Sequence, residues 1–375
     1  MSNKVLVIGV GEVGGHALEF LCRTPGITHV YAMDVNRDKA ARKLACATYG
    51  AMFEGYFPKV EFIPGNVFDV AATAETIRRI QPDVILNTAS LQSWWVITLL
   101  PEPLYKRLQE AAIGPWLPMH LAPTYKVMQA VKESGIDTKV VSTPFPDVVN
   151  PVLNAVGLAP TVGAGNLDEL IPPFQKYVAD RMGVPSHSVE IFMVGHHFHN
   201  DAMFEMRTLG GAPYFLKIIV DGRDVTDQFP AEETLLAATE IYPIGKDDSP
   251  VIASSAIKNV LAILNDSGLR THAPGPKGLP GGYPVRIDSR GVEVVLPEGI
   301  TLEEAVSINK EAQKFDGVEE IRDDGTVVFT DKAYKVMKDV LGYDCRVLAL
   351  EDAEEAAKEL RRAYDLFVSK ATKSA

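Results

Sequence analysis

The chain has 375 residues, which is long for one typical domain and sufficient for two. Its composition, 46% hydrophobic and 23% charged, is that of an ordinary globular protein with a large core. The formal net charge of −12 argues against nucleic acid and anionic membranes as partners, because both bind basic surfaces.

The three cysteines, Cys22, Cys46 and Cys345, lack the short spacing of a metal site and fit a reducing compartment without disulfides. The N-terminus runs directly into an apolar strand, without the basic region and apolar core of a signal peptide. No apolar run is long enough to cross a bilayer. We therefore expect a cytoplasmic protein that does not act at membranes.

The stretch "KVLVIGVGEVGGHALEFLCR" at 4–23 predicts a buried strand, a glycine-rich turn and a helix. Gly9 permits the tight turn, Gly11 lets a pyrophosphate approach the backbone, and Gly14 lets the helix pack closely on the strand. The N–H groups of Glu12 and Val13 at the helix start would face the phosphates. A glycine-rich turn without a ligand is the alternative, which the flanking strand and helix make less favourable.

The next strand, "HVYAMDV" at 29–35, contains Asp34 about 20 residues beyond the last glycine, where a carboxylate can hydrogen-bond the adenosine ribose. Because that carboxylate would repel a 2′-phosphate, we expect NAD rather than NADP as the cofactor. Arg37 is the dissenting residue, since an arginine just past this strand can accept the phosphate. We interpret it as a solvated charge.

Strands and helices continue to alternate through 59–67, 70–80, 82–90, 123–134 and 138–144, which predicts a doubly wound parallel sheet of the Rossmann type over 1–150. Ligands bind such sheets at the carboxyl ends of the strands. Small residues there would let a flat cofactor lie close, although ordinary turn residues look the same. The candidate cofactor-binding residues at these ends are Thr88, Ala89, Ser90, Ser142 and Thr143.

Between these strands, residues 91–121 form a long apolar stretch rich in Trp and Pro, "LQSWWVITLLPEPLYKRLQEAAIGPWLPMHL". We interpret it as a lid or a substrate wall, with Trp94 and Trp95 as candidate substrate contacts. A packing or subunit-contact surface is an equally acceptable interpretation.

Residues 151–375 show a mixed pattern, which predicts a second, α+β domain that carries the catalytic residues. We expect a helix over 164–183 and a strand over 188–201 that ends in "VGHHFHND". A strand and turn follow at 214–229, a long helix at 249–268, a hairpin at 278–299, and helices at 301–315 and 351–375.

Three segments of this region resemble the lactate/malate dehydrogenase family. They are "VVSTPFPDVVNPVLNAVGLAPTVGAGNLDEL" at 140–170, "GVPSHSVEIFMVGHHFHND" at 183–201 and "KGLPGGYPVRIDSRGVEVVLPEGITLEEAVSINKEA" at 277–312. The resemblance implies a two-domain NAD-dependent dehydrogenase that forms a homodimer or homotetramer. The stretch "GNVFDVAATAETIRRIQPDVILNTAS" at 65–90 looks more like the nucleotide domains of saccharopine dehydrogenases.

The resemblance places His197 on the family's catalytic histidine and Asp168 on its orienting aspartate. The chemistry agrees, because hydride transfer from an alcohol needs a base for the hydroxyl proton, and a carboxylate fixes the tautomer of a histidine. On an extended strand, His197 and His199 would share one face while His196 points to the other. His199 is therefore a further candidate substrate contact.

Two residues depart from the family's pattern. Ile171 occupies the position of the arginine that binds the substrate carboxylate, and Thr143 that of the strand-end asparagine. An apolar Ile171 cannot pair a carboxylate, and burying that charge unpaired is costly. We therefore expect a secondary alcohol or ketone other than a simple 2-hydroxy acid, one that is larger, more apolar or sugar-like.

Two other functions stay open. An NAD- and metal-dependent glycosidase would use His197, His199 and Asp201 as metal ligands, although no cysteine lies near these residues in the sequence. A protein that holds NAD without turnover is the other, which an intact His–Asp pair disfavours. The sequence favours the NAD-dependent dehydrogenase, with no metal.

Overall fold

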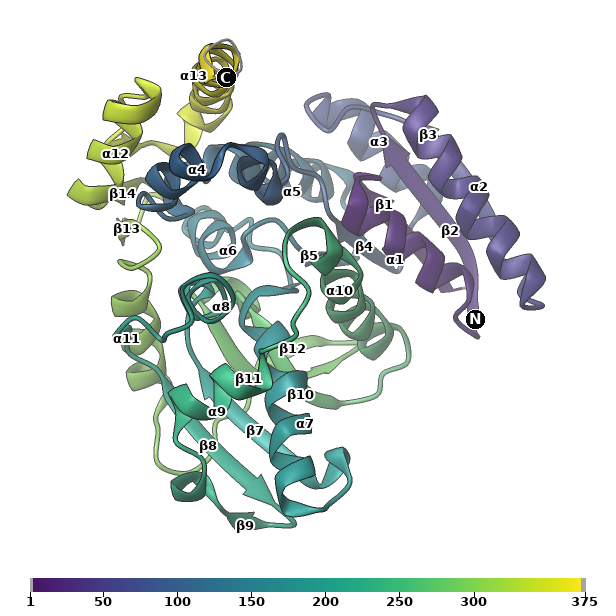
Figure 1. Cartoon of the computed structure of the whole chain (residues 1–375). Coiled ribbons are helices and arrows are strands. Elements are labelled where there is room, and N and C mark those ends of the chain that lie inside the picture. Colours follow the sequence, from purple (N-terminus) through teal and green to yellow (C-terminus); the bar gives the residue numbers. More distant parts are fainter. Residues whose placement is uncertain (1–2, 372–375) are drawn as a thin grey trace.

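The computed structural model describes residues 3–371, and Figure 1 shows their arrangement. A six-stranded parallel sheet forms the first part of the fold, in the order β3-β2-β1-β4-β5-β6. This strand order confirms the predicted doubly wound sheet. Its strands are β1 (Asn3–Ile8), β2 (Ile27–Asp34), β3 (Lys59–Pro64), β4 (Val84–Asn87), β5 (Lys139–Ser142) and β6 (Val162–Gly163).

Helices cover both faces of this sheet, because its central strands carry apolar side chains on both sides. On β1, Val5 and Val7 belong to one buried cluster, while Leu6 and Ile8 belong to another. The first cluster lies under α1 and α10, and the second under α3, α5 and α13. The covering helices are α1 (Glu12–Cys22), α2 (Arg37–Phe53), α3 (Val70–Ile80), α5 (Pro118–Ser134), α10 (Ser249–Leu264) and α13 (Ala353–Ala371).

Beyond the parallel sheet, the described residues form three small antiparallel sheets, in keeping with the predicted mixed pattern. The last of them, within residues 318–348, shares the buried cluster that lies under α3, α5 and α13. One packs against α7 and contributes to a third buried cluster, and the predicted hairpin belongs to another. The strands are β7 (Val189–Val194), β8 (Phe215–Val220), β9 (Arg223–Asp224), β10 (Leu269–Pro274), β11 (Gly282–Asp288), β12 (Gly291–Val294), β13 (Val318–Ile321), β14 (Val327–Phe329) and β15 (Val347–Leu348). The remaining helices are α4 (Glu102–Gln109), α6 (Pro146–Asn154), α7 (Ile171–Met182), α8 (His197–Asp201), α9 (Ala231–Ala238), α11 (Leu302–Ala312) and α12 (Asp331–Leu341).

The chain passes back and forth between these two parts. Strand β6 joins the parallel sheet after the predicted boundary at residue 150, and α10 packs on α1 although it lies far along the chain. At the C-terminus α13 packs on α5 and α12 on α4. The domain boundary at residue 150 stays a prediction. The parallel sheet contains strands from both sides of it.

The predicted strand over 188–201 is too long. Strand β7 ends at Val194, where its pairing with Phe215 of β8 ends, and the backbone turns into α8 at His197. A single turn of π-helix continues α8 through Ala202–Met206. The predicted alternation of the three histidines is therefore wrong, because successive helical residues do not alternate between two faces.

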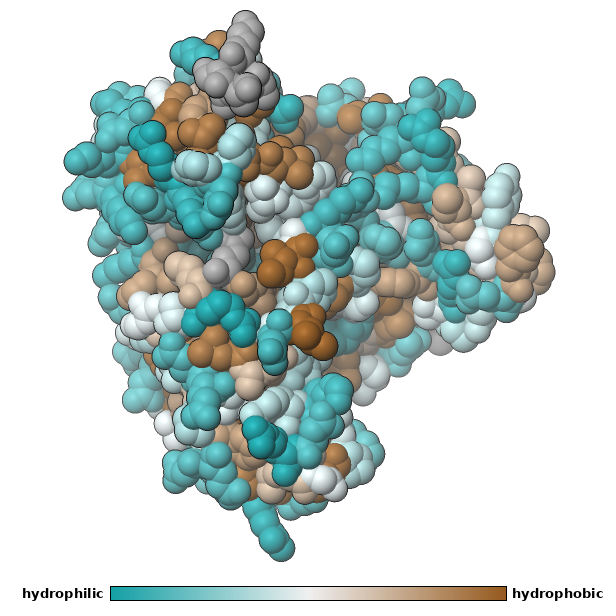
Figure 2. Space-filling view, viewed as in Figure 1, coloured by the Kyte–Doolittle hydropathy of each residue, from teal (hydrophilic) through white to brown (hydrophobic). Residues whose placement is uncertain are grey.

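Hydrophilic residues cover most of the face shown in Figure 2. Within residues 3–371, no helix combines the length and apolarity needed to cross a membrane.

Gly14 packs closely against the glycine-rich turn that follows β1. A Cβ atom at Gly14 would lie 2.0 Å from the backbone oxygen of Gly9, whereas a Cβ at Gly11 would have no atom within 4 Å. We therefore expect Gly14→Ala to lower the free energy of unfolding by ~1–3 kcal/mol, the usual cost of overpacking. Gly11→Ala is the matched control and is expected to cost less than about 1 kcal/mol. Denaturant unfolding of both variants measures the difference, and equal losses would contradict this packing.

Candidate active site

One cavity of about 870 Å³ runs along the carboxyl ends of the parallel strands and on to α8. Its wall includes the glycine-rich turn at Gly9, Asp34 at the end of β2, and His197 at the start of α8. The nucleotide-binding signature and the histidine stretch therefore face the same space, although they lie far apart in the sequence.

The glycine-rich turn has the geometry that a phosphate site needs. Gly9 adopts φ +88°, where a side chain would be strained and would strike Ala89. Gly11 caps α1 and leaves open space where its side chain would be, so a pyrophosphate can approach the helix N-terminus. The predicted cofactor residues that line the cavity are Gly9, Gly11, Glu12, Val13, Asp34, Thr88, Ala89, Ser90 and Thr143.

Two predicted cofactor residues do not line the cavity. Gly14 lies behind the turn against Gly9 and Thr88, in the packing role that the sequence suggested. Ser142 is fully buried and accepts a hydrogen bond from Asn87 Nδ2 at 3.2 Å, so its assignment as a cofactor contact is wrong. Thr143, the residue that follows β5, lines the cavity instead.

Asp34 is held by the backbone around it. Its carboxylate accepts hydrogen bonds from the N–H of Val10 at 2.6 Å and of Asn36 at 2.7 Å. Arg37 is exposed and does not line the cavity, whereas Lys39, two residues further along α2, does. Lys39 is a cation that the sequence did not single out, and its Nζ lies 3.8 Å from Glu12.

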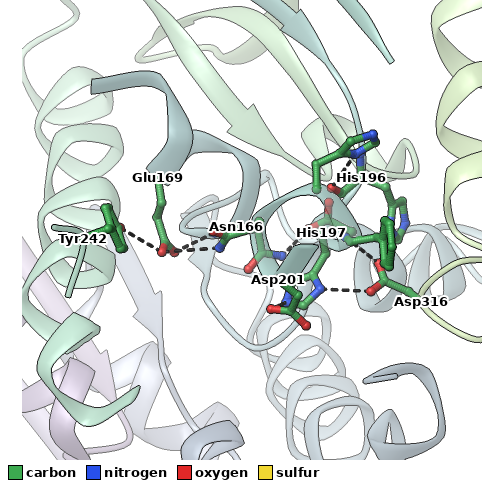
Figure 3. Close-up of polar contacts among 11 residues, drawn as sticks. Asn166, Glu169, His196, His197, Asp201, Tyr242 and Asp316 are labelled. Atoms are coloured by element: carbon green, nitrogen blue, oxygen red, sulfur yellow. Dashed lines mark hydrogen bonds and ion pairs between the residues drawn. The ribbon is translucent and has the colours of Figure 1, made fainter. Parts of the chain in front are cut away.

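The carboxylate of Asp316 organises the histidine stretch (Figure 3). His196 donates from Nδ1 to one of its oxygens at 2.5 Å, and the N–H of Phe198 donates to the same oxygen at 2.9 Å. His197 donates from Nδ1 to the other oxygen at 3.1 Å. Asp316 follows α11 and is fully buried, so it fixes both imidazoles and the first turn of α8 at once.

Asp168 is not the partner of His197, so the predicted pairing is wrong. Lys258 on α10 donates from Nζ to both carboxylate oxygens of Asp168, at 2.8 and 2.6 Å, and the hydroxyl of Ser255 donates to one of them. Asp168 lies in a short 3₁₀ helix, Asn166–Leu170, that packs against α10. The carboxylate that the family resemblance assigned to His197 therefore pairs with Lys258 instead.

His199 and Ile171, the other predicted substrate contacts in this domain, do not line the cavity. His199 is fully buried, where its Nδ1 accepts from the N–H of His196 at 3.1 Å and its Nε2 faces the carbonyl of Ala212 at 3.4 Å. Ile171 opens α7 and packs against the apolar cluster behind it. Both assignments are wrong, because α8 and α7 turn these side chains away from the cavity.

Carboxylates set the charge of His197. Burial by itself would lower the pKa of its imidazole, but the negative charges of Asp201 and Asp316 outweigh burial and raise that pKa to about 10. Asp201 lies one helical turn further along α8, with its carboxylate 3.7 Å from Nε2. Burial would raise the pKa of Asp316, but the two imidazoles lower it well below its usual value. His197 is therefore an imidazolium at neutral pH.

Three of these groups also meet the spacing of a metal site. Ligand atoms of His197, Asp201 and Asp316 lie within 4.8 Å of one another. Both oxygens of Asp316 already accept N–H hydrogen bonds, however, and no cysteine lines the cavity. The set His197, His199 and Asp201 suggested by the sequence is not assembled, because His199 points away.

A second polar group lies on the other side of the cavity, and the sequence did not single it out. Glu169 follows Asp168 directly and points into the cavity, where Tyr242 donates to it at 3.1 Å and the N–H of Asn166 at 2.7 Å (Figure 3). The same Tyr242 hydroxyl lies 3.2 Å from Asp248. The only sequence signal was the pair of adjacent acids in "NLDEL". Asp168 pairs with Lys258, and its neighbour Glu169 is the acid that faces the cavity.

The apolar stretch between β4 and β5 covers this space. Trp94 and Trp95, which open a 3₁₀ helix, and Trp116 all line the cavity. Their place beside the cavity agrees with a substrate wall, and their contact with a substrate stays a prediction.

No protein-family model and no curated protein matches the chain. Solved structures do match it. A malate dehydrogenase from Cryptosporidium parvum has a TM-score of 0.59 and 17% identity, over 84% of this chain and 97% of its own. A lactate dehydrogenase from a Medee basin deep-sea metagenome library has 0.58 and 15%, over 84% and 96%.

A malate dehydrogenase from Plasmodium falciparum, solved with NADH, has a TM-score of 0.54 and 13% identity, over 98% of this chain and 100% of its own. These similarities show that the chain has the two-domain fold of lactate and malate dehydrogenases, as the sequence resemblance implied. The resemblance of residues 65–90 to saccharopine dehydrogenases stays a prediction.

The charge of His197 can be measured by NMR titration of its ring protons. We expect a midpoint near pH 10 in the native protein, and a lower midpoint in Asp316→Asn because one raising charge is removed. Since the folded pKa lies above the value of about 6.5 for an unfolded chain, His197 stabilises the fold below pH ~6.5 and loses that contribution as the pH rises through ~10. Asp365→Asn, on the exposed face of α13, is the matched control. A native midpoint at or below 7 would contradict the arrangement.

Proposed function

We propose that the protein is an NAD-dependent dehydrogenase that interconverts a secondary alcohol and a ketone. The observation that carries this proposal is the single cavity that joins the glycine-rich turn and Asp34 to His197. A dinucleotide laid along the strand ends places its phosphates at the start of α1, and the rest of it extends toward α8. The lactate and malate dehydrogenase fold supports the same orientation.

The residues of the cavity fit a dinucleotide by shape and charge. Gly9 and Gly11 leave room for the pyrophosphate, and the carboxylate of Asp34 is positioned to accept from ribose hydroxyls. The ends of β4 and β5 supply the small residues Thr88, Ala89 and Thr143 along the path. A bound nicotinamide would supply the acceptor or donor of the hydride.

His197 would move the proton of the reaction. Its Nδ1 is committed to Asp316, so a substrate oxygen would meet Nε2, which lies beside the carboxylate of Asp201. Because its pKa is raised to about 10, the resting side chain holds a proton at neutral pH and is prepared to protonate a ketone oxygen. The charge therefore favours ketone reduction, and alcohol oxidation is expected to improve at alkaline pH. We also propose a homodimer or homotetramer, as the family resemblance implies.

Two alternatives from the sequence remain distinguishable. The group His197, Asp201 and Asp316 keeps the metal-dependent glycosidase as a second candidate. A non-catalytic NAD-binding protein would have no use for an imidazolium directed at the cavity, so the His197–Asp316 pair disfavours it. The experiments below separate the three.

The cofactor preference tests the role of Asp34. We expect NAD to bind about tenfold tighter than NADP, a difference of ~1.4 kcal/mol, because Asp34 repels the 2′-phosphate. Lys39 opposes this preference, and Arg37 does not line the cavity. Calorimetric dissociation constants for both cofactors measure the ratio in the native protein, in Asp34→Asn and in Arg37→Ala as the control. Equal or tighter binding of NADP to the native protein would refute the assignment.

Replacing His197 tests the proton transfer. We expect His197→Asn to reduce turnover of a ketone with NADH by roughly 10²- to 10⁴-fold, the usual contribution of a general acid. The dissociation constant of NADH should change by less than about twofold, since the dinucleotide would meet mainly the strand ends. His187→Asn, an exposed histidine outside the cavity wall, is the control. Turnover that survives in His197→Asn would rule out this role.

Metal analysis separates the glycosidase alternative. We expect purified protein to hold well under one equivalent of any transition metal, and chelation to leave ketone reduction unchanged. The reason is that both oxygens of Asp316 already accept N–H hydrogen bonds. A stoichiometric metal, with activity lost on chelation and restored by that metal, would favour the alternative.

A further inference from the structure

The polar group opposite His197 consists of hydrogen-bond acceptors. Glu169 and Asp248 are 3% and 5% exposed, and both line the cavity. Tyr242 has one hydroxyl hydrogen, yet its oxygen lies within hydrogen-bonding distance of both carboxyls. Tyr242 can donate to only one of the two carboxyls at a time, and the N–H of Asn166 donates to Glu169 alone. Among the described residues, Asp248 therefore has no side-chain donor besides Tyr242 and a protonated Glu169.

Asn200 adds a third acceptor. It is 7% exposed, lines the cavity, and donates from Nδ2 to Glu169 at 3.4 Å. That bond sets the amide orientation when Glu169 is ionised, because an ionised carboxylate can only accept, from the NH₂ side. The amide oxygen is thereby left buried with no hydrogen-bond partner among the described residues. A buried acceptor without a donor is costly, which points to a ligand that supplies the donor.

The basic residues of the cavity wall do not neutralise these acids. Lys39, Lys106 and Lys332 line the cavity but are all exposed, and Lys106 pairs with Glu102. Within residues 3–371, neither Glu169 nor Asp248 forms an ion pair with a lysine, arginine or histidine. Lys246, beside Asp248 in sequence, approaches Glu12 instead. A pair of buried acids thus lies without a protein cation.

Burial keeps these acids from ionising fully in the absence of a ligand. Burial, together with the charge of Asp248, raises the pKa of Glu169 well above its usual value, and burial raises the pKa of Asp248. Such a pair holds a proton where no other positive charge is present, and a cationic ligand can replace that proton.

We propose that this cavity takes a ketone or alcohol that carries an ammonium group, and that Glu169, Asp248 and Asn200 hold the ammonium while His197 meets the oxygen. An ammonium has three N–H donors, which match three acceptors. The proposal rests on the proposed dehydrogenase function and names its substrate class. Asn200 lies three residues after His197 on α8, so the same helix reaches both ends of the substrate.

The same site disfavours a substrate carboxylate. A second negative charge beside Glu169 and Asp248 would have no cation to pair with, and like charges at a buried site repel strongly. Glu169, buried and lining the cavity, therefore selects against a negatively charged group on this side of it.

The test compares methyl ketones in which one to four methylene groups separate the carbonyl from an ammonium, a hydroxyl or a carboxylate. Calorimetry measures their binding to the NAD-loaded protein, and NADH oxidation measures their turnover. We expect the best ammonium ketone to bind at least about tenfold tighter than its hydroxyl analogue, and the carboxylate analogue to bind weakest. Because binding is measured separately from turnover, the experiment detects the lack of an ammonium preference even if the protein does not transfer a hydride.

Glu169→Gln and Asp248→Asn keep the shape of each side chain and remove its charge. Each should reduce the ammonium-to-hydroxyl binding ratio by about tenfold. Glu233→Gln, an exposed acid on α9, is the matched control and should leave the ratio unchanged. Circular dichroism verifies that each variant folds. Because there are two variants, the test can still be made if one of them does not fold.

Two outcomes would overturn the proposal. One is tighter binding of the carboxylate ketones than of the ammonium ketones at every chain length. The other is a loss of NAD affinity in Glu169→Gln with an unchanged ammonium-to-hydroxyl ratio, which would assign the acid pair to the cofactor. In either case the proposed dehydrogenase function stands or falls separately, on the His197→Asn result.

Discussion

The site depends on the hydrogen bonds that the carboxylate of Asp316 accepts. This carboxylate accepts hydrogen bonds from the imidazoles of His196 and His197 and from the backbone of Phe198, inside a fully buried environment. A buried carboxylate is stable only when its lone pairs are used, and here three donors use them. Because the same carboxylate also accepts from the N–H of Phe198, it holds the first turn of α8, the helix that follows β7. Local fold and site chemistry thus have one cause.

The charged groups differ between the two sides of the cavity. At the α8 end, Asp201 and Asp316 hold His197 as a cation, which suits a proton donor. On the opposite side, Glu169 and Asp248 are acids without a protein cation. The glycine-rich turn lies at a third position, where backbone N–H groups rather than lysines would meet phosphates. In the proposed substrate, the carbonyl oxygen would meet the protonated His197 and the ammonium would pair with Glu169 and Asp248. No charge would then be buried without a partner.

The parallel sheet was predictable from sequence because its signals are local. Apolar runs of strand length, the glycine spacing and the acid at Asp34 all lie within single βα units. His197 was also identifiable, since it lies in a motif that resembles a known family. Its partner was not, because Asp316 lies 119 residues further along the chain, in a segment without a motif. Only the packing of the loop after α11 against α8 brings the two together.

Other differences from the sequence prediction have the same origin. Asp168 matched the family motif, but Lys258 on a distant helix donates to its carboxylate, and periodicity does not predict that contact. Lys39 rather than Arg37 reaches the cavity because α2 begins at Arg37, and position in the first turn decides which side chain faces inward. The sequence also did not show whether Asp168 or Glu169 faces the cavity. That depends on how the 3₁₀ helix runs into the start of α7.

A crystal structure of the protein with NADH would test the central claim most directly, namely that one cavity joins the dinucleotide site to a histidine held by Asp316. The account predicts electron density for the pyrophosphate at Gly11 and the start of α1, with the nicotinamide ring beside His197. His197 should keep its Nδ1 hydrogen bond to Asp316 and leave Nε2 open to the substrate space. A nicotinamide bound away from His197, or a His197 side chain turned from Asp316 to another partner, would contradict the account.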